Sequence, residues 1–165
     1  MDETLSLEER IGILLRQRRW KLALAESCTG GLLGHRITNV PGSSEYFLGG
    51  IVAYAYEAKV NLLGVRWETL ERYGAVSRET VLEMARGARE RLGAEIALSI
   101  SGIAGPGGGT PEKPVGTTWI GLVAPDGEQA YRFQFHGDRE ANKQQATDQA
   151  LRLLLDYLIS SSPAP

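Results

Sequence analysis

Two hydroxyl residues stand beside two glycines in the segment 26–31, Glu-Ser-Cys-Thr-Gly-Gly. The segment follows a short apolar run and precedes a helical one, which predicts a strand-to-helix turn at the edge of a sheet. At such a turn Ser27 could attack a carbonyl group, while backbone N–H groups near Thr29, Gly30 and Gly31 bind a phosphate or an oxyanion. The same residue types are also common helix caps. The segment lacks the Gly-x-Ser-x-Gly pattern of the α/β-hydrolases.

A lysine further along the chain could supply the base that a serine nucleophile needs. Lys59 lies in a predicted short helix, and Tyr54 ends the strand before it. Burial or a nearby positive dipole lowers the pKa of a lysine, and the neutral amine can then accept a serine proton. Serine–lysine pairs are a known variant of the nucleophile-and-base arrangement. The Tyr54 hydroxyl could relay a proton or orient either partner, whereas a lone helical lysine is more often a surface residue.

A glycine-rich segment, 101–109, follows a third predicted strand. Glycines directly after a strand can form a backbone cradle for an anion, although a mobile surface loop has the same composition. The segment is not a P-loop, because Gly108 stands where that motif requires lysine. Arg139, in the first turn of a last predicted helix, could pair with a phosphate or remain a surface residue.

The composition limits other kinds of chemistry. The 165 residues include two histidines, His35 and His136, and one cysteine, Cys28. An internal disulfide is therefore ruled out, and a zinc site of Cys and His ligands is not expected. A magnesium or calcium ion bound by carboxylates stays open, although no calcium-loop pattern occurs. The formal net charge of −2 gives no reason to expect a nucleic-acid partner.

The length and composition of the chain predict one cytoplasmic domain. No apolar run is long enough to span a membrane, and residues 1–4, Met-Asp-Glu-Thr, do not resemble a signal peptide. Together with the single cysteine, these features favour the cytoplasm. We expect one domain over residues 1–165, with frayed ends at 1–5 and 160–165.

Strands and helices alternate along the chain. Strands are predicted at 21–25, 50–55, 95–101, 117–123 and 129–135. Helices are predicted after a capping box at Ser6 and Glu9, at 32–38, at 57–63, after Ser77 and after Asp138. A Pro-Asp-Gly turn at 125–127 joins the last two strands into a hairpin. The fold class is therefore α/β, a three-layer α/β/α sandwich with a mixed sheet.

Six segments carry a family resemblance, in this order along the chain: 25–31, 54–65, 74–77, 99–106, 113–116 and 137–139. On these segments the chain closely resembles the nicotinamide-nucleotide amidase family, also called the CinA C-terminal domain family, over roughly residues 7–158. Some members carry a further N-terminal domain, and this chain is expected to be the stand-alone form. One position departs from the family. Tyr56 stands where members often have asparagine, which would change affinity or selectivity if that side chain touches substrate.

The resemblance implies an activity and roles for particular residues. The implied reaction is hydrolysis of nicotinamide mononucleotide to nicotinate mononucleotide and ammonia, with no metal and no organic cofactor. The implied catalytic residues are Ser27 as nucleophile, Lys59 as base and Tyr54. The implied substrate-binding residues are Thr29, Gly30, Gly31, Ser101, Gly102, Gly105 and Arg139. The resemblance also implies a homodimer or larger homo-oligomer, a small nucleotide as substrate, and neither nucleic acid nor membrane as partner.

Two alternatives stay open. Cys28 is a rival nucleophile because thiols cleave amides well, although a continued strand pleat would turn its side chain away from that of Ser27. The domain could instead be a non-catalytic regulator that binds a pyridine nucleotide.

Overall fold

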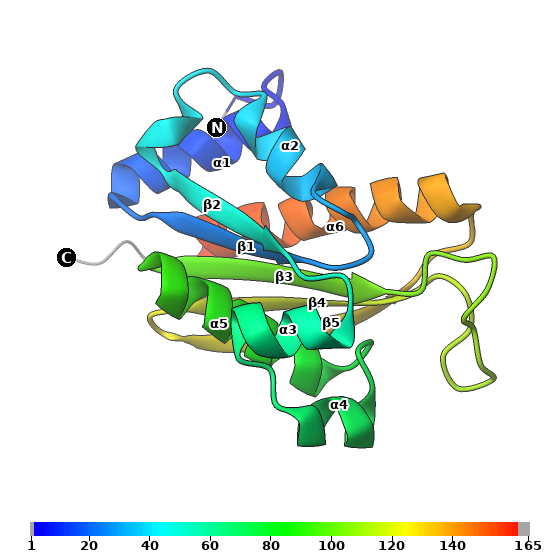
Figure 1. Cartoon of the computed structure of the whole chain (residues 1–165). Coiled ribbons are helices and arrows are strands. Elements are labelled where there is room, and N and C mark those ends of the chain that lie inside the picture. The colour runs from blue at the N-terminus through cyan, green and yellow to red at the C-terminus, as the bar shows by residue number, and fades with distance from the viewer. Residues whose placement is uncertain (1, 162–165) are drawn as a thin grey trace.

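The computed structural model describes residues 2–161, and its centre is one five-stranded sheet in the order β2-β1-β3-β4-β5 (Figure 1). The strands are β1 (Leu22–Glu26), β2 (Phe47–Val52), β3 (Ile96–Gly102), β4 (Thr117–Ala124) and β5 (Gly127–Gln134). β1 pairs in parallel with both β2 and β3, whereas β4 is antiparallel to both β3 and β5. The predicted mixed sheet is therefore confirmed.

Helices cover both faces of this sheet. They are α1 (Leu7–Arg18), α2 (Leu32–Thr38), α3 (Tyr56–Leu63), α4 (Trp67–Tyr73), α5 (Arg78–Leu92) and α6 (Arg139–Ser160), with a 3-10 turn η1 (Ser43–Glu45). Helices α1, α2 and α6 lie on one face, and α3, α4 and α5 lie on the other (Figure 1). The α/β/α sandwich is confirmed. Within residues 2–161, no helix combines the length and apolar character needed to cross a bilayer.

The pleat of β1 divides the core into two clusters. Leu22 and Leu24 pack with α1, α2 and α6, whereas Ala23 and Ala25 pack with the helices of the opposite face. Successive side chains of a strand point to opposite faces, and small side chains let a helix approach closely. The same alternation separates the neighbours Glu26 and Ser27, whose side chains bond to α2 and to α3 respectively. The end of β1 therefore supplies one polar side chain to each layer of helices.

Some element boundaries differ from the predicted ones. β2 lies three residues earlier than predicted, at 47–52 instead of 50–55. Glycines 49 and 50 interrupt its apolar pattern, and its register with β1 shifts beside them. The short helix α4 was not predicted, and no side chain caps it at Arg66. Ser160, expected in a frayed end, is the last residue of α6. Of the expected frayed ends, Met1 and 162–165 lie outside the described residues.

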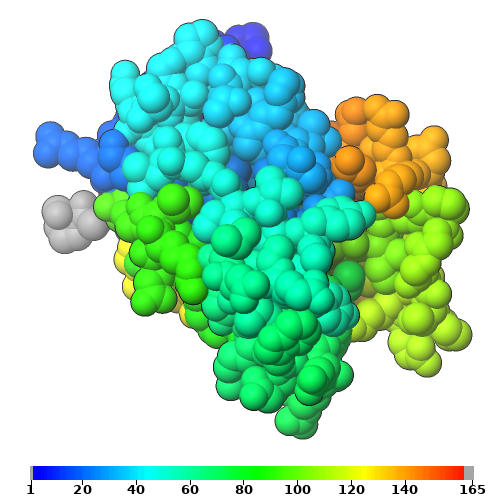
Figure 2. Space-filling view, viewed as in Figure 1, coloured from blue at the N-terminus to red at the C-terminus, as the bar shows by residue number. Residues whose placement is uncertain are grey.

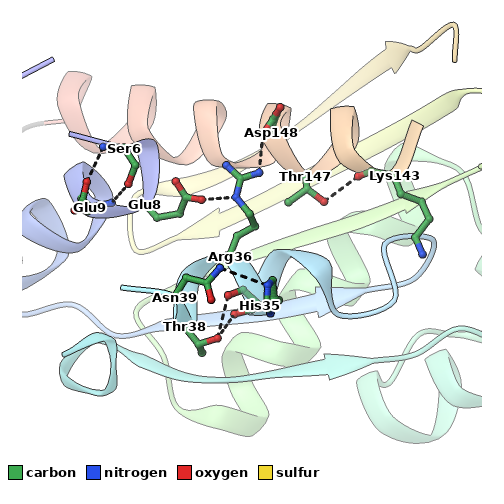
Figure 3. A network of polar contacts seen from close by, with 11 residues as sticks. Ser6, Glu8, Glu9, His35, Arg36, Thr38, Asn39, Lys143, Thr147 and Asp148 are labelled. Atoms are coloured by element: carbon green, nitrogen blue, oxygen red, sulfur yellow. Dashed lines mark hydrogen bonds and ion pairs between the residues drawn. The ribbon is translucent and has the colours of Figure 1, made fainter. Parts of the chain in front are cut away.

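Polar contacts fix α2 between α1 and α6. Arg36 of α2 forms ion pairs with Glu8 of α1 and with Asp148 of α6, the latter at 2.7 Å (Figure 3). The side chains of Arg36 and Glu8 are mostly shielded from solvent, so salt screens this pair less than an exposed one. The helix that follows the candidate nucleophile is therefore held on two sides.

Close packing of α5 against α3 requires a glycine at position 87. A Cβ atom built on Gly87 would lie 1.9 Å from the carbonyl oxygen of Leu63, at the end of α3. We expect Gly87→Ala to lower the free energy of unfolding by about 1–3 kcal/mol, because the α3 backbone must move away. Equilibrium unfolding in urea measures this loss.

Glu90→Ala, at an exposed position of α5, is the matched control and should change the free energy of unfolding by less than about 0.5 kcal/mol. Equal losses in the two variants would contradict the packing argument.

Candidate active site

The carboxyl ends of β1 and β3 meet at one edge of the sheet. From β1 the chain crosses one face through α2 to reach β2, then returns over the other face through α3, α4 and α5 to reach β3. A reversal of this kind leaves a crevice at the strand ends, which is where open α/β sheets bind ligands. The loop after β3 and the start of α6 lie at the same edge (Figure 1). A cavity of about 260 Å³ opens there.

This active-site cavity gathers most of the residues that the sequence patterns indicated. It is lined by Ser27, Cys28, Tyr54, Lys59, Ala75, Val76, Ser101, Gly102, Ile103, Ala104, Gly105, Gly107, Gly108 and Arg139. Thr29, Gly30 and Gly31 are not among the lining residues. Across residues 2–161, no group of three or more His, Cys, Asp or Glu side chains is placed to hold a metal ion.

Ser27 and Lys59 form a buried pair. The Lys59 Nζ lies 2.9 Å from the Ser27 Oγ, and the two residues are 1% and 7% exposed. The same nitrogen donates hydrogen bonds to the main-chain carbonyls of Ala53, at 2.9 Å, and Tyr54, at 2.8 Å. Burial lowers the pKa of Lys59 from its usual 10.5 to about 8. The neutral amine is therefore a minor form of Lys59 near physiological pH and becomes the major form above about pH 8.

The three oxygen neighbours of Lys59 decide how the neutral amine is oriented. An ammonium group donates to all three oxygens, whereas a neutral amine has two N–H groups and one lone pair. Two N–H groups satisfy the carbonyls of Ala53 and Tyr54, which have no hydrogen to offer in return. The lone pair then faces Ser27, whose hydroxyl donates to it. The arrangement can therefore remove the proton from Ser27.

Local chain geometry brings Lys59 to this position. The Ala53 N–H donates to the Glu26 carbonyl at 2.9 Å, which continues the β1–β2 pairing just past β2. The chain then turns into α3, and Lys59 occupies the face of that helix that packs on the sheet. The two carbonyls that hold its nitrogen belong to the connection that precedes α3. Strand end, turn and helix therefore form one short unit around the amine.

Glu26 is a residue of this site that none of the sequence patterns marked. Its carboxylate is 1% exposed and accepts a hydrogen bond from the Thr29 hydroxyl at 2.6 Å. It also accepts from the N–H groups of Gly31 at 3.2 Å, Leu33 at 3.0 Å and Gly34 at 2.9 Å. The first N–H groups of a helix lack partners inside the helix, and Gly31 has no side chain to cap α2. The sequence signal that could have marked Glu26 is its position five residues before Gly31, the glycine at the start of α2.

Contrary to the prediction, Thr29, Gly30 and Gly31 do not face the cavity as anion-binding groups. The Thr29 hydroxyl and the Gly31 N–H already donate to Glu26. The Gly30 N–H donates to the Ser27 carbonyl at 3.1 Å. These three donors are therefore used within the protein, and they hold the segment that carries Ser27.

Tyr54 positions Arg139 and does not contact the serine–lysine pair through its hydroxyl. The Arg139 Nη2 donates to the Tyr54 hydroxyl at 2.9 Å, and Nη1 donates to the Gly105 carbonyl at 2.7 Å. Only the main-chain carbonyl of Tyr54 bonds to Lys59. The proton relay considered for the Tyr54 hydroxyl is therefore not supported by its position, and its contact with Arg139 crosses the mouth of the cavity.

The glycine-rich loop is anchored at its base and open at its tip. Asn142 of α6, which the sequence patterns also left unmarked, is 3% exposed and donates to the Ala104 carbonyl at 3.0 Å. In Figure 2 the loop, in yellow-green, lies against the start of α6, in orange. Among residues 2–161, no acceptor bonds to the backbone N–H groups of Ala104, Gly105, Gly107 or Gly108. The loop therefore offers free donors to the cavity, as an anion cradle requires.

Two other side chains near the site, those of Cys28 and Tyr56, pack against other side chains of the protein. Cys28 lines the cavity but also packs into the core cluster of α1, α2 and α6, as the strand pleat predicts. Burial raises the pKa of the Cys28 thiol to about 11, so the nucleophilic thiolate is rare near neutral pH. Tyr56 packs against Trp67 of α4, with ring centres 6.4 Å apart, and does not line the cavity.

Comparisons with known proteins agree with this fold. The family model of the CinA C-terminal domain matches residues 4–158. CinA-like proteins of Chlorobaculum tepidum and Chlorobium limicola are 56% and 52% identical over 91% and 93% of this chain. The chain spans only 37% of the length of each of these relatives. A crystal structure of a CinA superfamily protein from Klebsiella pneumoniae is 39% identical, with a TM-score of 0.90 over 94% of this chain and 97% of that one. The chain belongs to the CinA C-terminal domain family.

Proposed function

We propose that this domain hydrolyses the carboxamide of nicotinamide mononucleotide to nicotinate mononucleotide and ammonia. The observation that carries the proposal is the position of the Lys59 Nζ, held by two main-chain carbonyls and 2.9 Å from the Ser27 Oγ. A serine beside a buried neutral amine is the pair needed to attack an amide, and it lies in a cavity. The choice of nucleotide rests on the family relationship and on the donors of the glycine-rich loop.

The first half of the reaction forms an acyl-enzyme. Lys59 takes the Ser27 proton while the Ser27 Oγ bonds to the carboxamide carbon, and the carbonyl π electrons move to its oxygen. As the tetrahedral intermediate collapses, the C–N bond breaks and the Lys59 ammonium returns a proton to the leaving nitrogen. Ammonia departs and an ester joins Ser27 to the nicotinoyl group.

The second half of the reaction uses the same groups with water as nucleophile. Lys59, neutral again, takes a proton from a water that attacks the ester carbon. Collapse of this second intermediate breaks the bond to the Ser27 Oγ, which recovers its proton from Lys59. The product acid releases its remaining proton to solvent and leaves as a carboxylate. No step requires a change of oxidation state or a second reactant other than water.

The remaining polar groups of the cavity bind the substrate in this proposal. Ser101 is 1% exposed and lines the same cavity as Ser27 and Lys59. It is assigned to the carboxamide oxygen, where negative charge develops. The free N–H groups of the glycine-rich loop are assigned to the ribose side of the nucleotide.

Removing the Ser27 hydroxyl should abolish the reaction. We expect Ser27→Ala to lower turnover of nicotinamide mononucleotide by at least about 10³-fold, because no nucleophile remains. Ammonia release measures turnover, and a circular dichroism spectrum checks that the fold is retained.

Cys28→Ala is the matched control, because it changes the neighbouring side chain and should keep most of the activity. A folded Ser27→Ala protein with normal turnover would overturn the proposal. Loss of activity in Cys28→Ala alone would assign the nucleophile to the thiol.

The pKa of Lys59 predicts how activity depends on pH. A base works only when deprotonated, so kcat/KM should rise with pH and reach half of its plateau near pH 8. The second ionisation of the substrate phosphate, with a pKa of about 6, lies well below this step. Initial rates at constant ionic strength give the profile, and a rate that does not change across the pKa of Lys59 would rule out this base.

A further inference from the structure

A second cavity lies next to the active site. Its volume is about 370 Å³, and it is lined by Leu32, Arg139, Glu140, Lys143 and Gln144. Arg139 lines both cavities, so the two are neighbours. The second cavity lies between the start of α2 and the first two turns of α6. It therefore extends the active site away from Ser27.

Lys143 points to the turn that carries the nucleophile. A Cβ atom built on Gly30 would lie 3.9 Å from the Lys143 Nζ. Figure 3 shows the Lys143 side chain leaving α6 toward the loop between β1 and α2. The lysine is four residues after Arg139, so the two side chains share one face of α6. One helix face therefore presents two positive charges along the line that joins the cavities.

The charges of these two cations are not neutralised by ion pairs among residues 2–161. Within the described residues, neither Arg139 nor Lys143 forms an ion pair, whereas Arg16, Arg36 and Arg86 each do. Like charges four residues apart destabilise a helix slightly. Glu140 is the one acidic side chain among the five that line this cavity. The local charge therefore remains positive and favours an anion.

Arg139 retains donors for such an anion. Its guanidinium has five N–H groups, of which one bonds to the Gly105 carbonyl and one to the Tyr54 hydroxyl. Those two contacts fix the plane of the guanidinium, and its remaining donors bond to no acceptor in the described part of the chain. A fixed guanidinium and a flexible ammonium are the groups that bind a phosphate monoester, the first through paired hydrogen bonds and the second as a point charge.

We propose that Arg139 and Lys143 form a subsite for the phosphate monoester of the substrate. This inference rests on the proposed function, because it places the carboxamide at Ser27 and the phosphate beyond Arg139. The ribose then spans the glycine-rich loop between the two cavities. Lys143 thereby becomes a specificity-determining residue that distinguishes a nucleotide from the corresponding nucleoside.

Binding of ribose 5-phosphate tests the subsite without requiring any turnover. We expect the wild-type protein to bind ribose 5-phosphate more tightly than ribose, measured by NMR titration. Lys143→Gln should weaken ribose 5-phosphate binding about 10-fold, the effect of losing about one charged hydrogen bond. Arg152→Gln, which removes one positive charge from an exposed position of α6, is the control and should leave binding unchanged.

Steady-state kinetics supplies the second readout. Lys143→Gln should raise KM for nicotinamide mononucleotide about 10-fold with little change in kcat, and should leave kcat/KM for nicotinamide riboside unchanged. A general loss of fold would lower kcat/KM equally for both substrates, and it would also appear in the unfolding curve.

The outcomes separate the two proposals. Equal affinity of the wild-type protein for ribose and ribose 5-phosphate overturns the subsite, as does equal binding by wild type and Lys143→Gln. Binding of ribose 5-phosphate that depends on Lys143, together with no hydrolysis of nicotinamide mononucleotide, supports the subsite and overturns the proposed reaction.

Discussion

The nitrogen of Lys59 has three oxygen neighbours and almost no contact with solvent, and the rest of the site is arranged around it. Removing an amine from water disfavours its charged form, while the two carbonyls still leave it hydrogen-bonded. The opposing effects give an amine that can lose its proton without losing its position. The close contact between α5 and the end of α3 at Gly87 maintains this environment, since it sets where α3 lies against the sheet.

The end of β1 serves two purposes with adjacent residues. Ser27 faces α3 and the cavity, while Glu26 faces α2 and satisfies the donors at the start of that helix. In many α/β proteins the helix after the first strand binds the phosphate of a ligand. Here a side chain of the protein occupies that place, so the turn is rigid before any ligand arrives. The proposed function therefore assigns anion recognition to the loop after β3 and to α6.

Residue type and spacing were sufficient to predict the sandwich, the hairpin and the caps at Ser77 and Asp138. They also made Ser27 and Lys59 candidates, and the family resemblance joined the two into a pair. The sequence patterns did not predict the direction in which some side chains point. The Tyr54 hydroxyl turns to Arg139, a contact between segments far apart in the sequence. Glu26 turns inward to the donors of the turn and helix that directly follow it. β2 was misplaced because glycines in its middle give no apolar alternation.

The loop after β3 is tied to α6 through Ala104 and Gly105, near its base. The serine and lysine, by contrast, are held by β1, β2 and α3, which precede that loop in the chain. Insertions or replacements at the loop tip can therefore accumulate without disturbing the reacting groups. Such a division lets descendants of one ancestral domain diverge in this loop while they inherit the same serine–lysine pair.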